Sequence, residues 1–186
     1  HVGGIEIANI KAFVTPKLAA IDSVSNALGL IGYDLLSRFN QVAINLRDGT
    51  VQFNPSSYNS NNCVAMAFAL NSNMLPAGIA TTISIEGKSL KARIDTGANV
   101  DLILHGEGIL PGIASQELAG GSLMDGSGSH VPLHFAHLRA RLGTEESEHS
   151  VILAPGRHPD FDVTLGMQFL AGRNFTFDFA KQRFCL

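Results

Sequence analysis

A pattern that occurs twice constrains the fold of this chain more than any other feature of its sequence. Asn45–Phe53 and Asp178–Leu186 each consist of an apolar strand, a charged turn and a second apolar strand, and the two segments align without a gap. Just upstream, Leu30–Leu36 and Thr164–Leu170 each run from an apolar strand to a glycine and then to a short helix. Because the two patterns recur in the same order, we expect the second half of one domain to occur twice.

The repeat divides the 186 residues into three predicted parts. Residues 1–54 are expected to be the C-terminal half of a first repeat, and residues 78–186 a complete repeat. Residues 55–77 are expected to be a linker or surface loop, since they begin with a polar stretch that has no period. A natural fold rarely starts halfway through a domain, so the first half of the first repeat is expected to precede His1.

Composition favours a globular domain that is mostly β. Short stretches with alternating apolar residues, such as 81–85, 90–94 and 174–179, are separated by many of the 19 glycines and 7 prolines. Such a series of short strands indicates a closed or sandwich-like β architecture, and Glu86-Gly87 has the sequence of a tight hairpin turn. With 45% hydrophobic and 16% charged residues, the chain is not a disordered tail, and its net charge of −3 argues against a nucleic-acid partner.

Other features bound the environment of the protein. No apolar run approaches the roughly 20 residues that cross a bilayer, so no membrane partner is expected. Cys63 and Cys185 could form one disulfide bridge or none. The Asn/Ser-rich stretch at 54–62 and the low lysine content favour an exported, periplasmic protein.

Histidines are frequent toward the end of the chain, and we interpret them as surface residues rather than as a metal site. His134 and His137 are three residues apart, so on a strand their side chains project to opposite faces and do not converge on one ion. The histidines in question are His130, His134, His137, His149 and His158.

A four-residue motif, Asp95-Thr96-Gly97-Ala98, lies between two apolar strands of the complete repeat. A carboxylate that activates water has to sit on a rigid turn with little side-chain bulk around it. Gly97 allows the backbone to approach closely and can supply an N–H to the Asp95 carboxylate, and Thr96 can hydrogen-bond to a neighbouring loop. We therefore interpret Asp95 as a catalytic residue that Thr96, Gly97 and Ala98 support.

In this strand context the motif resembles the active-site loop of the retropepsin-like aspartic proteases. The resemblance extends to Val163-Thr164-Leu165-Gly166, which is similar to the hydrophobic-hydrophobic-Gly segment of that family, and to residues 124–129, which lie where the family has its flap hairpin. It covers about residues 78–186, and its trailing half recurs at 5–53. The resemblance implies a mostly β, retropepsin-like acid-protease barrel with a short helix after each glycine segment.

The resemblance also implies an aspartic endopeptidase that hydrolyses peptide bonds without a cofactor or a metal. In such a site a water lies between two Asp carboxylates, one ionised and one protonated, because like charges about 3 Å apart share a proton. Asp95 is one of the two. The flap over the peptide substrate would contain Asp125, Gly126, Ser127 and Gly128, since glycines favour the mobility that a lid requires.

Three alternatives follow from the presence of a single Asp-Thr-Gly motif. The extra half-repeat favours a bilobal, pepsin-like protein in which an N-terminal lobe of the same polypeptide supplies the second Asp. A symmetric homodimer with a pair of Asp95 residues is the alternative among proteases. A retropepsin-like module that binds peptides without cleaving them is the alternative from another class of protein.

Overall fold

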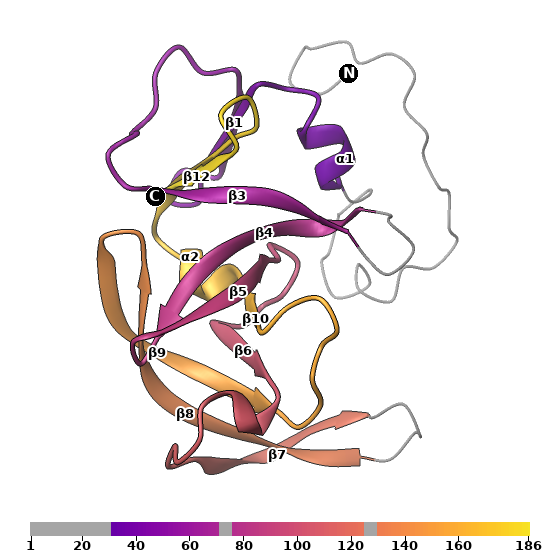
Figure 1. Cartoon of the computed structure of the whole chain (residues 1–186). Coiled ribbons are helices and arrows are strands. Elements are labelled where there is room, and N and C mark those ends of the chain that lie inside the picture. The colour runs from indigo at the N-terminus through magenta and orange to yellow at the C-terminus, as the bar shows by residue number, and fades with distance from the viewer. Residues whose placement is uncertain (1–30, 71–75, 125–129) are drawn as a thin grey trace. The chain divides into compact units, whose positions relative to one another are not determined.

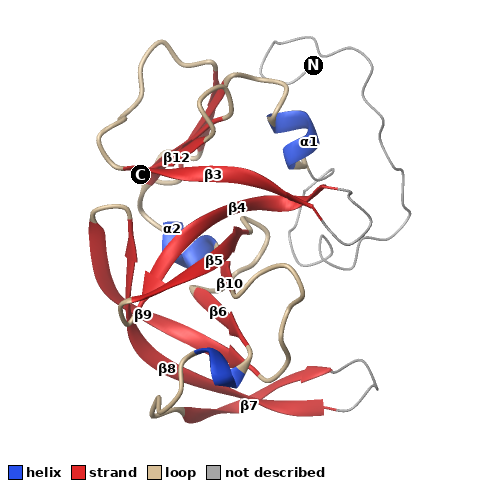
Figure 2. Ribbon diagram, in the orientation of Figure 1, coloured by secondary structure: helices blue, strands red, loops and turns tan. Residues whose placement is uncertain are grey.

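The structure is a computed structural model that describes residues 31–70, 76–124 and 130–186 (Figure 1). The chain divides into two compact units, residues 1–39 and residues 40–186. In the first unit the described residues contain the short helix α1 (Tyr33–Leu36), which begins after Gly32 in an extended conformation. Strands dominate the second unit, and its helices are short (Figure 2). No helix among the described residues is long and apolar enough to cross a membrane.

The second unit is built on one sheet of twelve strands, counted over the described residues, in the order β2-β1-β11-β12-β3-β4-β5-β10-β6-β9-β8-β7. A 3₁₀ turn, η1 (Glu107–Ile109), follows β6, and a short helix, α2 (Met167–Leu170), follows β10. The strands are β1 (Gln41–Asn45), β2 (Thr50–Phe53), β3 (Cys63–Leu70), β4 (Pro76–Ile85), β5 (Lys88–Ile94), β6 (Leu102–His105), β7 (Gln116–Met124), β8 (His130–Leu142), β9 (Glu145–Ala154), β10 (Val163–Leu165), β11 (Asn174–Asp178) and β12 (Arg183–Cys185).

Six of these strands form a partly closed ring. β4, β5, β10, β6, β9 and β8 follow one another in the sheet, and a short pairing of Ser84 with Arg141 brings β8 back to β4. β5 with β10 and β6 with β9 are parallel pairs, whereas the other pairs in the ring are antiparallel. The ring is filled by fully buried aliphatic side chains, among them Ile83, Leu102, Leu104, Leu142, Val151 and Leu165. The prediction of a mostly β fold is therefore confirmed.

The predicted turn at Glu86-Gly87 is confirmed as the connection between β4 and β5. Both residues have positive φ, 48° and 78°, which is the backbone conformation of a type I′ turn. This turn matches the right-handed twist of the two strands that it joins, and β5 leads directly into the Asp95 motif.

The two hairpins of the predicted repeat pair with each other. β1 of the first hairpin runs antiparallel to β11 of the second, and Ala43 lies opposite Thr176. These two residues occupy the same position in their respective copies, so the pairing has a local two-fold axis between them. The two β-turns also match: Gly49 and Gln182 are equivalent, and both have positive φ, 63° and 52°.

Side-chain hydrogen bonds extend the correspondence between the hairpins. Asn45 Oδ1 accepts the N–H of Asp48 at 3.0 Å. At the equivalent position of the second hairpin, Asp178 Oδ1 accepts the N–H of Lys181 at 2.9 Å. The repeat seen in the sequence is thus present in the strands, the turns and the hydrogen bonds of residues 41–53 and 174–185, while the assignment of whole domains to it stays a prediction.

The interpretation of residues 55–77 as a linker or loop is wrong for part of that range. Residues 63–70 form β3, which pairs with β12 on one side and with β4 on the other (Figure 1). The run from Val64 to Leu70 is apolar throughout, so it gains more by joining the sheet than by lying in water as a loop. β3 connects the two hairpins to the ring, and among the described residues before it a loop is found at 54–62.

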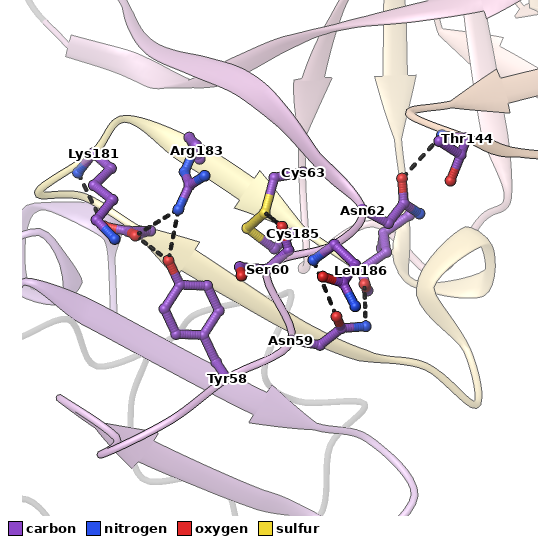
Figure 3. Close-up of a disulfide and its surroundings, with 12 residues drawn as sticks. Tyr58, Asn59, Ser60, Asn62, Cys63, Thr144, Lys181, Arg183, Cys185 and Leu186 are labelled. Carbon is purple, nitrogen blue, oxygen red and sulfur yellow. Dashed lines mark hydrogen bonds and ion pairs between the residues drawn. A yellow bond between two sulfur atoms is a disulfide. The ribbon is translucent and has the colours of Figure 1, made fainter.

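The two cysteines, whose state the sequence left open, form a disulfide between β3 and β12. Cys63 lies directly opposite Cys185 in the antiparallel pair, and the bridge closes a separation of 122 residues (Figure 3). Within the described part of the chain there is no free cysteine. The bridge therefore ties the start of β3 to the last strand of the chain.

A buried carboxylate, that of Asp178, lies opposite Arg183, two residues before Cys185 on β12. The Asp178 side chain has no exposed surface, and it accepts hydrogen bonds from the Tyr58 hydroxyl and the Lys181 N–H. The Arg183 guanidinium lies 3.6 Å from Asp178 Oδ2 and donates to the Tyr58 hydroxyl at 3.0 Å (Figure 3). Burial by itself raises the pKa of Asp178, but the bonds from Tyr58 and Lys181 and the nearby positive charges hold it below its ordinary value. The hydrogen bond to Asp178, followed by burial, raises the pKa of Tyr58, and the Arg183 guanidinium opposes part of this shift.

Candidate functional site

The Asp95 motif lies in the loop between β5 and β6, at the end of the parallel pair that β5 forms with β10. Leu165 of β10 lies opposite Ile94 of β5 and also opposite Leu102 of β6, so β10 separates the two strands that the loop connects. The Asp95 N–H donates to the Leu165 carbonyl at 2.9 Å and continues the parallel ladder by one bond. The buried ends of the strands therefore fix the position of the first residue of the motif.

The first turn of α2 fixes the rest of the loop. The Ala98 carbonyl accepts the N–H of Met167 at 2.8 Å, and the Val100 carbonyl accepts the N–H of Gln168 at 3.0 Å. These N–H groups have no partner within their own helix, so the loop carbonyls take the place of a side-chain cap. The Gly166 N–H in turn donates to the Asp101 carbonyl at 2.9 Å. Gly166 therefore packs closely against the Asp95 loop, and a Cβ added to it would meet the Ala98 and Val100 carbonyl oxygens.

Gly166→Ala is expected to lower the free energy of unfolding by about 1–3 kcal/mol, because an added Cβ would lie 2.3 Å from the Val100 carbonyl oxygen and 2.8 Å from that of Ala98. Gly156→Ala is the matched control, since a Cβ there meets nothing within 4 Å, and we expect a change within about 0.5 kcal/mol. Urea unfolding of both variants measures the difference. Equal stabilities would contradict the close packing of this loop.

Both oxygens of the Asp95 carboxylate have donors. Oδ1 accepts the Gly97 N–H at 3.0 Å, as expected from the sequence, and Oδ2 accepts Nη2 of Arg93 at 2.8 Å. The Asp95 side chain is 32% exposed and that of Arg93 is 31% exposed, so the pair is open to solvent on one side. Thr96 and Gly97 are exposed, and Ala98 is half-buried. The loop thus presents one anchored carboxylate to the surface.

Arg93 was not among the predicted site residues, although its position two residues before Asp95 indicates that the two side chains lie on the same face. Residues two apart on a strand project to the same face, so a side chain at position 93 lies on the same side of β5 as that of Asp95. The guanidinium also packs 5.6 Å from the centre of the Phe161 ring. Its Nε is buried and has no hydrogen-bond partner among the described residues.

The far end of the loop is held by a second group that the sequence interpretation missed. Asp101 accepts hydrogen bonds from His149 Nδ1 at 2.9 Å and from the Ser150 N–H at 3.0 Å. The His149 ring stacks on Phe169 of α2 at 4.5 Å between centroids. The His149 side chain is only 10% exposed, so its interpretation as a surface residue is wrong: a neighbouring carboxylate and an aromatic ring compensate its burial.

A second histidine lies against β10. His105 Nε2 and the Thr164 hydroxyl are 2.8 Å apart, and the pKa of His105 is lowered by burial first and then by the positive charges of His158 and Arg93. His105 is therefore a neutral partner of a buried hydroxyl rather than a surface cation. In the parts of the chain that the structure describes, no group of three or more His, Cys, Asp or Glu side chains is arranged to hold a metal ion.

The predicted flap residues Asp125, Gly126, Ser127 and Gly128 lie outside the described residues. β7 and β8 flank them as an antiparallel pair in which Met124 lies opposite His130. The structure therefore describes the two arms of a hairpin on either side of this segment. The role of the four residues stays a prediction.

No family model matches the chain, and no curated protein matches it. The site is therefore interpreted from its own geometry.

Proposed function

We propose that the protein is an aspartic endopeptidase with a retropepsin-like barrel, in which Asp95 is one member of a catalytic pair. The observation that carries the proposal is the anchoring of the Asp95 loop. Its backbone is bonded to β10 and to the first turn of α2, yet the Asp95 carboxylate stays accessible. A rigid, solvent-facing carboxylate with a backbone N–H on one oxygen can orient a water molecule for attack on a carbonyl.

The second carboxylate comes from another lobe of the same polypeptide. The pairing of β1 with β11 supports this arrangement, because two equivalent hairpins of one chain already meet across a local two-fold axis. In a homodimer built on the same axis, the second copy would have to supply the hairpin that pairs with β11. That edge of β11 is occupied by β1, so the bilobal arrangement is favoured over the homodimer.

In the proposed reaction a water bound between the two carboxylates attacks the scissile carbonyl. The ionised Asp takes the proton of the water, and the protonated Asp donates to the carbonyl oxygen, so the pair titrates as a unit. The substrate is a peptide in extended conformation, which adds to the fold as a strand and is covered by the β7–β8 hairpin. The disulfide supports an exported location, since such bridges persist in oxidising compartments.

The test combines native mass with peptide cleavage between pH 3 and 7. The bilobal proposal predicts that the chain of 19.7 kDa is a monomer and does not cleave peptides, whereas a polypeptide that includes the preceding lobe does. In that longer polypeptide Asp95→Asn should abolish cleavage, and Asp48→Asn, in an exposed turn, is the control. A particle of about 39 kDa that cleaves peptides would support the homodimer instead. Peptide binding without cleavage by the longer polypeptide would overturn the assignment as an enzyme.

A further inference from the structure

A chain of three hydrogen-bonded side chains lies at the far end of the Asp95 loop. Ser147 Oγ is 2.7 Å from His149 Nε2, and His149 Nδ1 is 2.9 Å from Asp101 Oδ1. We propose that Ser147, His149 and Asp101 form a second chemical site, in which Ser147 is a nucleophile for acyl transfer from small esters. Nucleophile, base and orienting carboxylate stand in the order and at the distances that this chemistry requires.

The strand β9 explains why the serine and the histidine meet. Ser147 and His149 are two residues apart on β9, so their side chains project to the same face of the sheet. The serine is exposed, whereas the histidine side chain is 10% exposed and that of Asp101 is 17% exposed. The nucleophile can therefore be reached from solvent while its two partners are held inside the fold.

The contacts of the imidazole define which nitrogen carries the proton. An ionised carboxylate only accepts hydrogen bonds, so the neutral ring carries its proton on Nδ1 and directs the lone pair of Nε2 to the Ser147 hydroxyl. Asp101 is itself oriented by the Ser150 N–H at 3.0 Å, and the ring is clamped by Phe169 at 4.5 Å. These contacts orient the base before a substrate arrives, which is what general-base catalysis requires.

The proposed donor to a negatively charged oxygen is the backbone N–H of Glu148, the residue after Ser147. The Ser150 N–H points away from β8 toward Asp101, and by strand alternation the Glu148 N–H points to the same side of β9. Among the described residues β9 acquires a partner strand on that side only from Val151 onward. The Arg173 guanidinium is held on the same face of β9 by its ion pair with Glu145, two residues before Ser147, and it also lies over the Phe169 ring.

The proposed reaction has two steps. Ser147 Oγ attacks the carbonyl carbon of the ester while its proton passes to His149 Nε2. The bond from that carbon to the alkoxy oxygen then breaks, and His149 returns the proton to the departing alcohol. In the second step water attacks the acyl-serine and gives a proton to His149, which transfers it to Ser147 Oγ as the carboxylic acid leaves. Ser147 is exposed to solvent, so the proposed substrates are esters of small acyl groups, which need no deep binding pocket.

The experiment uses the whole chain with a fluorophosphonate probe, and mass spectrometry locates the modified residue. We expect labelling at Ser147, loss of labelling in Ser147→Ala, and a fall in the labelling rate of about 10²-fold or more in His149→Asn, the usual contribution of a general base. Ser89→Ala is the control, because Ser89 is likewise an exposed serine on a strand, β5, and takes no part in the proposed site. This variant should label at the wild-type rate.

Release of p-nitrophenol from p-nitrophenyl acetate by the same variants gives a second readout. Should His149→Asn fail to fold, Ser147→Ala still decides the question, since it removes only an exposed hydroxyl. Absence of a label on Ser147, or ester hydrolysis that is equal in Ser147→Ala and the wild type, would overturn the proposal. Neither outcome bears on peptide cleavage, because the reaction at Ser147 needs no second carboxylate lobe.

Discussion

Replacement of both Cys63 and Cys185 by serine is expected to lower the free energy of unfolding by about 2–5 kcal/mol. The bridge closes a separation of 122 residues, so it removes many conformations from the unfolded chain. It also joins directly opposed residues of β3 and β12, the contact through which the hairpins connect to the ring. Urea unfolding of the double variant, compared with the wild type, measures the effect.

Reduction of the wild-type protein provides the control for this prediction. Dithiothreitol should destabilise the wild type by the same amount and leave the double serine variant unchanged. A loss of stability below about 1 kcal/mol in both experiments would mean that the other pairings of β3 suffice to hold the strand in place.

Asp178→Ala is expected to destabilise the protein by about 3 kcal/mol, because it removes a fully buried carboxylate that accepts hydrogen bonds from Tyr58 and Lys181. The repeat supplies a matched control in Asn45→Ala. Asn45 accepts the same turn hydrogen bond in the first hairpin but is neither charged nor fully buried, so a cost of about 1 kcal/mol is expected there. Thermal or urea unfolding of the two variants gives the comparison, and equal costs would contradict a special role for the buried charge.

The pH dependence of stability tests the same carboxylate. Since the folded-state pKa of Asp178 lies below the ordinary value of 3.8, its contribution is fully present above about pH 4 and is lost as the pH falls through the folded-state value. Asp178→Asn keeps an acceptor for the Lys181 N–H and removes the charge. We expect this variant to lose less stability than the wild type between pH 4 and 2. An identical acid transition in both proteins would contradict the depressed pKa.

Features that depend on local pattern could be predicted from the sequence. Alternating apolar residues indicated β5 and β11, Glu86-Gly87 indicated a hairpin turn, and the recurrence of one pattern indicated two equivalent hairpins. In each case the information lies within a few residues, or in the comparison of two short segments.

Features that depend on pairing between distant segments could not be predicted. β3 was missed because its apolar run follows a polar stretch, and only its pairing with β12 and β4 makes it a strand of the sheet. Asp101 and His149 are far apart in the chain and meet because the parallel pairing of β6 with β9 brings their ends together. Arg93 could have been noted from its spacing to Asp95, but the distance between the charges required the fold.

The pairing of β1 with β11 has a consequence for the order in which the protein is made. β1 leaves the ribosome about 130 residues before its partner, which at 5–20 residues per second is a delay of roughly 7–26 seconds. β12, which joins β11 to β3, is synthesised after both. During translation the first hairpin and β3 therefore keep open strand edges until β11 and β12, at residues 174–185, close the sheet between them.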